Sequence, residues 1–318
     1  EAADFSGLEV EQLCELKIRR LVIHEVLIRV TADLSVPDGP SYEYLGLQLR
    51  KMVDRIYSNY MVPKLDEIEQ GFLSIRDRAE KEISAFVGET CAFETSVRTS
   101  KKSLFDLFKR KPQSSHKTLD PPELRALENL RVKRHGSSAF SKACLNAVIY
   151  VVSGILGKQG RLVTDQKLIV KLALRVFCND YGSSEVGQLI DPIFVRAAKD
   201  EGFRFLPAQS EPIVMNTKGA SASGKSTIRP QQRLLAERMG IQWEDFALIS
   251  PDYWRKYLLN YDSLGDDYKY AAMLTGRELE FIDKKLDRYM AQKAEKKAIP
   301  HLLIDRFRFD SFKVGSEG

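Results

Sequence analysis

The spacing of apolar side chains predicts helices through most of residues 1–200. Helical periodicity covers residues 8–30 and 44–60, and after Pro63 apolar side chains return every three or four residues as far as residue 86. Packing between antiparallel helices is the simpler interpretation of these apolar faces, and a groove for a protein partner is the alternative. Further helices are predicted over residues 121–134, 139–157, 164–177 and 184–199.

The pattern changes after residue 210. Short apolar runs at residues 213–216, 246–249 and 301–304 have the length of strands, and helical patterns separate them. Strands that alternate with helices predict a parallel sheet flanked by helices. Because ligands bind at the carboxyl ends of the strands in such sheets, we expect the chemistry to lie where these runs end.

A phosphate-binding loop motif follows the first predicted strand. In such a loop, backbone N–H groups wrap the phosphates, Lys225 reaches the terminal phosphates, and the Ser226 hydroxyl can hold Mg²⁺. A helical pattern over residues 228–239 adds a helix N-terminus, and Pro230 predicts that this helix begins late or is kinked. The motif predicts binding of a nucleoside triphosphate, with a flexible Ser/Gly connector as the alternative. Its residues are Gly219, Ala220, Ser221, Ala222, Ser223, Gly224, Lys225, Ser226 and Thr227.

The predicted fold is therefore an α/β P-loop nucleoside-triphosphate-binding domain, incomplete at its C-terminal side, preceded by a mainly α-helical region. Its expected divisions are a helical region, a basic linker, a second helical region and the α/β domain. In the linker, lysines and an arginine are interleaved with Leu and Phe. A solvated linker is the simpler interpretation, and contact with acidic lipid or nucleic acid is the alternative. The divisions cover residues 1–97, 98–117, 118–205 and 211–318.

Two carboxylates follow the second and third predicted strands. Asp305 directly follows the apolar run 301–304, where an acid can hold Mg²⁺ directly or through water. Asp252 follows the second run, where the hydroxyl of an acceptor would approach the terminal phosphate. We expect Asp252 to act as a general base or to orient that hydroxyl, and helix capping is the alternative for this residue.

At these positions the chain resembles the zeta-toxin-like P-loop kinases. Residues 252–255, with the sequence D-Y-W-R, resemble the substrate motif of that family, in which the acid is the catalytic base. Residues 271–278, A-A-M-L-T-G-R-E, resemble a helix whose glutamate contacts the acceptor, and residues 303–308, L-I-D-R-F-R, are similar to the third-strand motif. The resemblance covers roughly the last third of the chain.

This resemblance implies an ATP- and Mg²⁺-dependent phosphotransferase. The acceptor would be a hydroxyl of a small molecule such as a nucleotide-activated amino sugar. Asp252 and Lys225 would be catalytic, and Ser226 and Asp305 would hold the metal. Tyr253 and Trp254, with Arg255 and Arg308, could bind a nucleotide or sugar diphosphate, but they would equally suit a nucleic-acid end or a protein hydroxyl. The substrate-binding positions implied are Arg255, Glu278 and Arg308.

The chain departs from the family in two places. Relatives continue beyond the third-strand motif into further strands and a lid with arginines, whereas this sequence ends at Gly318. The loop also has Ala222 and Ser223 where many relatives carry a glycine. We expect the missing lid to reduce the rate of transfer more than the affinity for the nucleotide, because transfer depends on neutralising charge in the transition state.

Composition indicates a globular protein without a dominant charge. Hydrophobic residues make up 43% of the 318 residues and the net charge is +5, which does not by itself predict a nucleic-acid partner. The four cysteines and four histidines are scattered without metal-ligand spacing, as in a reduced, cytoplasmic protein. No secretory signal opens the chain, which begins with Glu1 and so indicates a processed chain or a piece of a longer one. The apolar segment 143–157 is expected to be a buried helix, too short to cross a membrane.

Two other classes of function remain open. The α/β domain could be a nucleotide-gated switch or ATPase whose hydrolysis moves the helical region. The chain could also be an interaction protein, in which the helical region binds a protein partner and the P-loop domain has a structural role. If the chain is a toxic kinase, the helical region could inhibit or deliver it.

Overall fold

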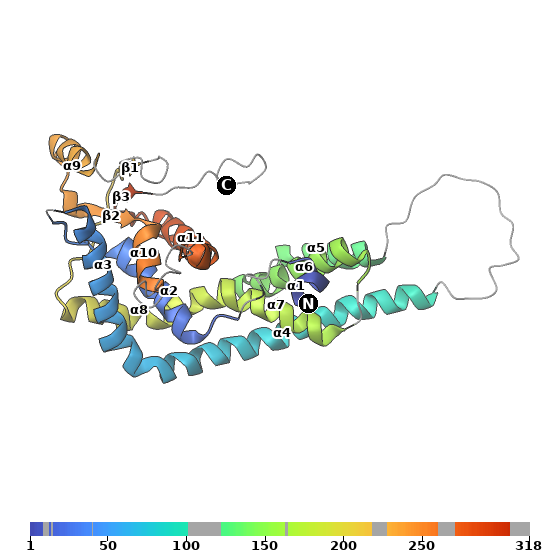
Figure 1. Cartoon of the computed structure of the whole chain (residues 1–318). Coiled ribbons are helices and arrows are strands. Elements are labelled where there is room, and N and C mark those ends of the chain that lie inside the picture. Colours follow the sequence, from blue (N-terminus) through green and yellow to red (C-terminus); the bar gives the residue numbers. More distant parts are fainter. Residues whose placement is uncertain are drawn as a thin grey trace, which may run out of the picture. The chain divides into compact units, whose positions relative to one another are not determined.

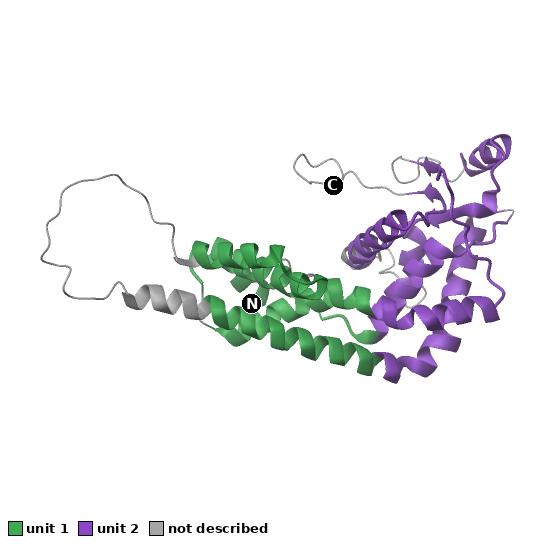
Figure 2. Ribbon diagram, turned by 180° about the vertical axis from the view of Figure 1, so that it is seen from behind, with its two compact units in different colours: residues 1–18, 69–185 green, residues 19–68, 186–318 purple. Residues whose placement is uncertain are grey.

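The computed structural model describes residues 1–8, 13, 15–39, 41–100, 122–162, 165–217, 228–259 and 271–305. The chain forms two compact units, unit 1 with residues 1–18 and 69–185, and unit 2 with residues 19–68 and 186–318 (Figure 2). Each unit combines segments that are far apart in the sequence, whereas the predicted divisions were continuous. Two of the three unit boundaries fall inside α4 (Leu65–Ser100) and α8 (Ser183–Asp200), and the third follows the first residue of α2 (Ile18–Asp33).

Unit 1 is helical in its described part. Its short helix α1 (Ala2–Ser6) and helices α5 (Pro122–His135) and α7 (Gln166–Phe177) pack against α6 (Ala139–Gln159). The π-helical turn η5 (Cys178–Gly182) continues α7. Helix α6 begins where the Ser138 hydroxyl accepts a hydrogen bond from the Ser141 N–H, and it ends at Gly160 in the left-handed conformation.

Helix α6 is long and apolar enough to span a membrane by length and composition. The helix extends beyond the apolar segment 143–157 at both ends and is longer than that segment indicated. The core helix of a soluble protein passes the same test, and eight side chains of α6 are buried inside unit 1. Cys144 is one of them, a free thiol whose pKa burial raises to about 12.

Helix α2 (Ile18–Asp33) is the most deeply buried helix segment of unit 2. Almost every residue from Leu21 to Ala32 is buried. The predicted helix over residues 8–30 was wrong at its N-terminal side, since residues 15–17 are not helical. In this segment the Leu16 N–H donates to the Asn179 side-chain oxygen at 3.4 Å, in place of a helical hydrogen bond.

The other predicted helices of residues 1–200 are present with shifts of a few residues at their ends, except that α4 continues to Ser100, well beyond the pattern that ended at residue 86. Helix α3 (Tyr42–Ile56) continues into a π-helical turn (Tyr57–Met61), and a 3₁₀ turn containing Pro63 (Val62–Lys64) leads into α4. Residues 98–100 of the predicted linker are the last residues of α4, and residues 101–117 lie outside the described residues.

Unit 2 also contains a three-stranded sheet of order β1-β3-β2 (Figure 1). Both pairings are parallel, which confirms the predicted strands and their direction. The strands are β1 (Val214–Asn216), β2 (Phe246–Ile249) and β3 (His301–Ile304). All four residues of β2 are buried. The ring of His301 accepts a hydrogen bond at Nδ1 from the Ile213 N–H (3.0 Å) and thereby fixes the start of β1 against β3.

Helices connect these strands. Helix α9 (Arg229–Arg238) and a 3₁₀ turn (Trp243–Asp245) lie between β1 and β2, and α10 (Pro251–Leu258) and α11 (Ala271–Glu295) lie between β2 and β3. Pro230 lies in the first turn of α9, so the late start predicted for this helix is confirmed. The α/β alternation agrees with the sequence prediction, whereas the P-loop assignment stays a prediction because residues 218–227 lie outside the described residues.

Candidate functional site

The carboxyl ends of the three strands meet at one edge of the sheet. Asn216 and Ile249 are both in register with Ile304, so the chain leaves all strands at the same level. Two backbone hydrogen bonds extend this register past the strand ends: Thr217 N–H donates to the Ile304 carbonyl, and Asp305 N–H donates to the Ile249 carbonyl, both at 2.9 Å. The sheet therefore holds Asp305 at the edge where ligands bind in parallel sheets.

The candidate phosphate-binding loop joins this edge to helix α9. Its residues 219–227, including Lys225 and Ser226, lie outside the described residues, but both of its flanks are described. The Gln232 side-chain N–H donates to the Thr217 hydroxyl at 2.8 Å, which ties the first turns of α9 to the end of β1. The chain thus leaves a strand at the carboxyl edge and returns as a helix beside the same strand, which is the setting that a P-loop requires.

Asp252 lies in the first turn of α10, directly after β2. Ser250 takes the N-cap position without a side-chain cap hydrogen bond, and Asp252 is the acidic residue of the first helical turn. A carboxylate is favourable at that position, so a role in starting the helix stays open beside the catalytic one. The Asp252 side chain is 66% exposed and accepts a hydrogen bond from Arg255 Nη1 at 2.7 Å. Arg255 also donates from Nε to the Thr275 hydroxyl at 3.1 Å, which links this pair to α11. Asp252 is therefore accessible to a ligand and held by a cation.

The aromatic residues of the D-Y-W-R motif are core residues. Tyr253 is 4% exposed and Trp254 is fully buried. Their polar atoms are also engaged, since Arg229 donates to the Tyr253 hydroxyl (3.1 Å) and the Trp254 indole donates to the Thr31 hydroxyl (3.0 Å). Neither side chain presents a surface to a nucleotide or a sugar. The proposed gripping role for these two residues was wrong, because α10 directs them toward α2 and α9.

Glu278 on α11 is bound by two residues of α2. Arg20 donates to it from Nε and from Nη2, the latter at 2.6 Å, and His24 Nε2 lies 2.6 Å from Oε1. On its other side, His24 Nδ1 lies 3.1 Å from Lys285 Nζ. A neutral imidazole satisfies both contacts, because it donates at Nε2 to the carboxylate and accepts at Nδ1 from the ammonium group.

The pKa values in this network agree with that assignment. Burial and then the charge of Lys285 lower the pKa of His24 to about 4, so its ring is neutral at pH 7. Burial alone would raise the pKa of Glu278, but hydrogen bonds from His24 and Arg20 outweigh it and lower this pKa to about 2. The glutamate expected to contact an acceptor is thus a permanent carboxylate that Arg20 and His24 already share.

Arg20, His24 and Lys285 were not predicted from the sequence as neighbours of the candidate site. Arg20 is partly exposed and also donates to the Leu258 carbonyl at 3.2 Å, so it connects α2, α10 and α11. One feature of the sequence could have indicated them: charged residues interrupt the apolar run of α2. If that helix is buried, these charged side chains need partners. The sequence alone did not show that those partners come from residues more than two hundred positions away.

Several other site predictions have no counterpart in the described residues. Arg308 lies outside them. Within the described ranges no group of three or more His, Cys, Asp or Glu side chains could hold a metal ion. That absence does not bear on Mg²⁺ at a P-loop, which is held largely by nucleotide phosphates and water.

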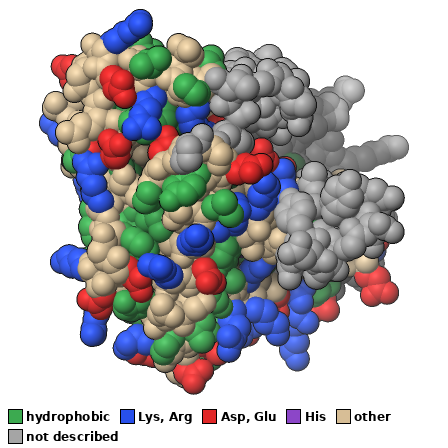
Figure 3. Space-filling view, turned by 60° about the vertical axis from the view of Figure 1, so that its left-hand side comes forward, with side chains coloured by type: hydrophobic (Ala, Val, Ile, Leu, Met, Phe, Trp, Pro, Cys, Tyr) green, Lys and Arg blue, Asp and Glu red, His purple; other side chains and the backbone are tan. Residues whose placement is uncertain are grey.

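On the face drawn in Figure 3, Lys and Arg side chains are interspersed with Asp and Glu.

Comparison with known protein families, curated proteins and solved structures found no match for this chain.

Proposed function

We propose that this protein is an ATP- and Mg²⁺-dependent phosphotransferase that resembles the zeta-toxin-like kinases. The observation that carries the proposal is the arrangement at the carboxyl edge of the sheet. There β1 leads into the P-loop sequence, and Asp252 and Asp305 follow the two other strands. A phosphate-binding loop with two acids at the same edge provides the groups that phosphoryl transfer needs.

Each residue has a distinct role in this proposal. Lys225 and the loop backbone bind the phosphates, and Ser226 and Asp305 hold Mg²⁺. Asp252 accepts the proton of the acceptor hydroxyl, while Arg255 keeps its carboxylate oriented. The acceptor is a small molecule with a hydroxyl, such as a nucleotide-activated amino sugar. Glu278 and Arg308 contribute to its binding, and Arg20 joins them through its pairing with Glu278.

The test is phosphorus NMR of the purified protein with Mg-ATP and a mixture of nucleotide sugars. A new phosphomonoester signal is the expected result. Asp252→Asn should lower the rate by about a hundredfold or more with little change in ATP affinity, because general-base catalysis contributes on that order. Lys225→Ala should weaken ATP binding and transfer together. Asp200→Asn, which removes a carboxylate at the end of α8, is the matched control and should behave like the parent.

Two results contradict the proposal. If Asp252→Asn transfers phosphate as fast as Asp200→Asn, Asp252 is not the base. If the parent protein binds no ATP, the P-loop assignment fails as a whole. A variant that loses its fold is recognised by its unfolding transition, so loss of activity through misfolding is separated from loss of chemistry.

A nucleotide-gated switch is the second candidate function. It is favoured by the observation that Glu278 is bound by Arg20 and His24 of α2. A change at the nucleotide site that alters α10 or α11 would be transmitted to α2 through these contacts. Release of free phosphate from ATP in the same experiment, without any phosphorylated acceptor, would support the switch and exclude the kinase for the acceptors offered.

A further inference from the structure

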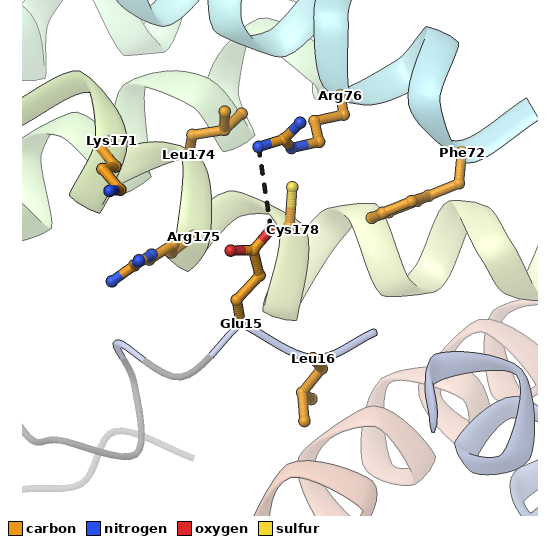
Figure 4. Close-up of a pocket in the computed structure, with 8 residues that line it drawn as sticks. All are labelled: Glu15, Leu16, Phe72, Arg76, Lys171, Leu174, Arg175 and Cys178. Carbon is orange, nitrogen blue, oxygen red and sulfur yellow. Dashed lines mark ion pairs between the residues drawn. The ribbon is translucent and has the colours of Figure 1, made fainter. Parts of the chain in front are cut away.

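Unit 1 contains a small cavity that the proposed enzymatic function does not use. It has a volume of about 50 Å³ and opens partly to solvent. A single water molecule needs roughly 10–15 Å³ of such a volume, so the cavity has room for a few waters or one small polyatomic ion. Its lining residues come from the segment before α2, from α4, from α7 and from the turn η5 (Figure 4). They are Glu15, Leu16, Phe72, Arg76, Lys171, Leu174, Arg175 and Cys178.

The charges around this cavity are unbalanced. Three cationic side chains, Arg76, Lys171 and Arg175, line it against one carboxylate, that of Glu15. The thiol of Cys178 does not compensate, because burial raises its pKa to about 12 and it stays neutral. Cations gathered around a partly enclosed space repel one another unless an anion lies between them. The lining therefore favours an anionic occupant.

Arg175 has unused hydrogen-bonding capacity. Within the described residues, Arg175 Nε is buried and has no hydrogen-bond partner, and Nη1 makes only a long contact of 3.4 Å with the Leu13 carbonyl. Arg76 lies 3.9 Å from Glu15, which is an ion pair without a short hydrogen bond. A buried guanidinium N–H without an acceptor costs free energy that a bound oxyanion would recover.

Glu15 occupies part of this space from a non-helical segment, and its side chain is half-exposed. Figure 4 shows its carboxylate reaching from this segment toward Arg76 and Cys178. Its carboxylate shows that an oxyanion fits among these residues. Because the side chain is half-exposed, it can turn toward solvent when a stronger oxyanion enters.

We infer that this cavity is a binding site for a small oxyanion with the charge and size of a phosphate group, held by Arg76 and Arg175 with Lys171 at the rim. Glu15 is the internal competitor for the same position. The phosphate can be free inorganic phosphate or the phosphate of a small metabolite. This site belongs to unit 1 and does not depend on the proposed kinase function.

The test measures phosphate binding by isothermal titration calorimetry in the Lys225→Ala protein, which removes the candidate P-loop from the measurement. One phosphate should bind to this protein, and Arg175→Gln should weaken it about tenfold or more, as expected for the loss of a charge-assisted hydrogen bond. Glu15→Gln should strengthen binding, because it removes the competing carboxylate. The matched control is Arg131→Gln, an exposed arginine of α5 that changes the net charge equally and should bind as the parent does.

The outcomes separate the possibilities. Equal affinity in Arg175→Gln and Arg131→Gln would overturn the site, as would absence of binding in Glu15→Gln at millimolar phosphate. If Arg175→Gln does not fold, two other variants provide the same test. Lys171→Gln should weaken phosphate binding, and Glu15→Gln should strengthen it. Glycerol 3-phosphate is titrated beside inorganic phosphate. Tighter binding of the free ion supports an enclosed ion site, and equal binding supports a site for the phosphate of a metabolite.

Discussion

Lowering the pH should destabilise unit 2, and the buried imidazole of His24 should account for much of the loss. His24 is fully buried between Glu278 and Lys285, both on α11, with Arg20 one turn away on its own helix. Protonation would place a second cation against Lys285 in a buried site. Burial, and then the charge of Lys285, lower the pKa of His24 to about 4 from the ordinary value of 6.5. His24 therefore binds a proton less readily in the folded protein than in the unfolded chain.

The sign and size of this effect follow from linkage. Between pH 6.5 and 4 the unfolded state binds more protons at this residue than the folded state, so the free energy of unfolding falls as the pH falls. From pH 7 to pH 5 the loss integrates to about 2 kcal/mol for pKa values of 6.5 and about 4. Glu278, whose pKa is lowered to about 2, contributes stability that is lost only below its unfolded pKa of 4.5, so it adds little in this window.

Urea unfolding followed by tryptophan fluorescence measures this effect selectively. Both tryptophans of the chain, Trp243 and Trp254, lie in unit 2, and Trp254 is fully buried. The signal thus reports the unit that contains His24, even if the two units unfold separately. The quantity compared is the difference in unfolding free energy between pH 7 and pH 5.

The informative variant is His24→Gln. A glutamine amide can donate to Glu278 and accept from Lys285 but does not titrate, so the pH-dependent loss should shrink by about 2 kcal/mol. The matched control is His135→Gln, an exposed histidine at the end of α5, which should keep the loss of the parent. An equal loss in parent and His24→Gln would refute the argument, because the destabilisation would then come from other groups.

Two further predictions concern packing in unit 2. Gly46→Ala should destabilise unit 2 by about 1–3 kcal/mol, because the new Cβ would lie 2.7 Å from the Tyr253 ring, whereas Gly276→Ala has open space and should be neutral or stabilising in the same urea assay. A fragment of residues 206–318 should lack a cooperative fluorescence transition, because it loses α2 and α3. A sharp transition in that fragment would show that the last third folds alone.

The sequence predicted the secondary structure well where one pattern dominated. The three strands and their parallel direction followed from short apolar runs separated by helical patterns. The helix predicted over residues 8–30 was wrong at its N-terminal side because the apolar spacing does not show where helical hydrogen bonds stop. Leu16 bonds to the distant Asn179 side chain there. A tertiary hydrogen bond of that kind leaves no local trace in the sequence.

The candidate site was predicted less completely than the fold. Motif positions placed Asp252 and Asp305 after their strands, since strand ends follow from local sequence. The same motif suggested a ligand role for Trp254, although its burial against Thr31 depends on how α10 packs on α2. Likewise, the pairing of Glu278 with Arg20 joins residues whose proximity only the tertiary fold creates.

The charged residues of α2 bear on whether the helical region is separable from the α/β part. Toward α11, Arg20 pairs with Glu278, and Asp33 accepts from Lys293 and from Tyr289. Arg29, one turn before Asp33, lies over the Tyr289 ring and also binds Asp191 and the Gly187 carbonyl of α8.

A buried helix with charged side chains costs free energy unless the partners of those side chains are present. Removing α2 would leave Glu278 and Lys293 without these counter-charges and would expose the buried face of α10. Residues 19–68 therefore act first as a structural part of unit 2. If the helical region inhibits or delivers a kinase, unit 1 is a better candidate for that role than residues 19–68. Residues of unit 1 can be changed without removing the charged partners of Glu278 and Lys293.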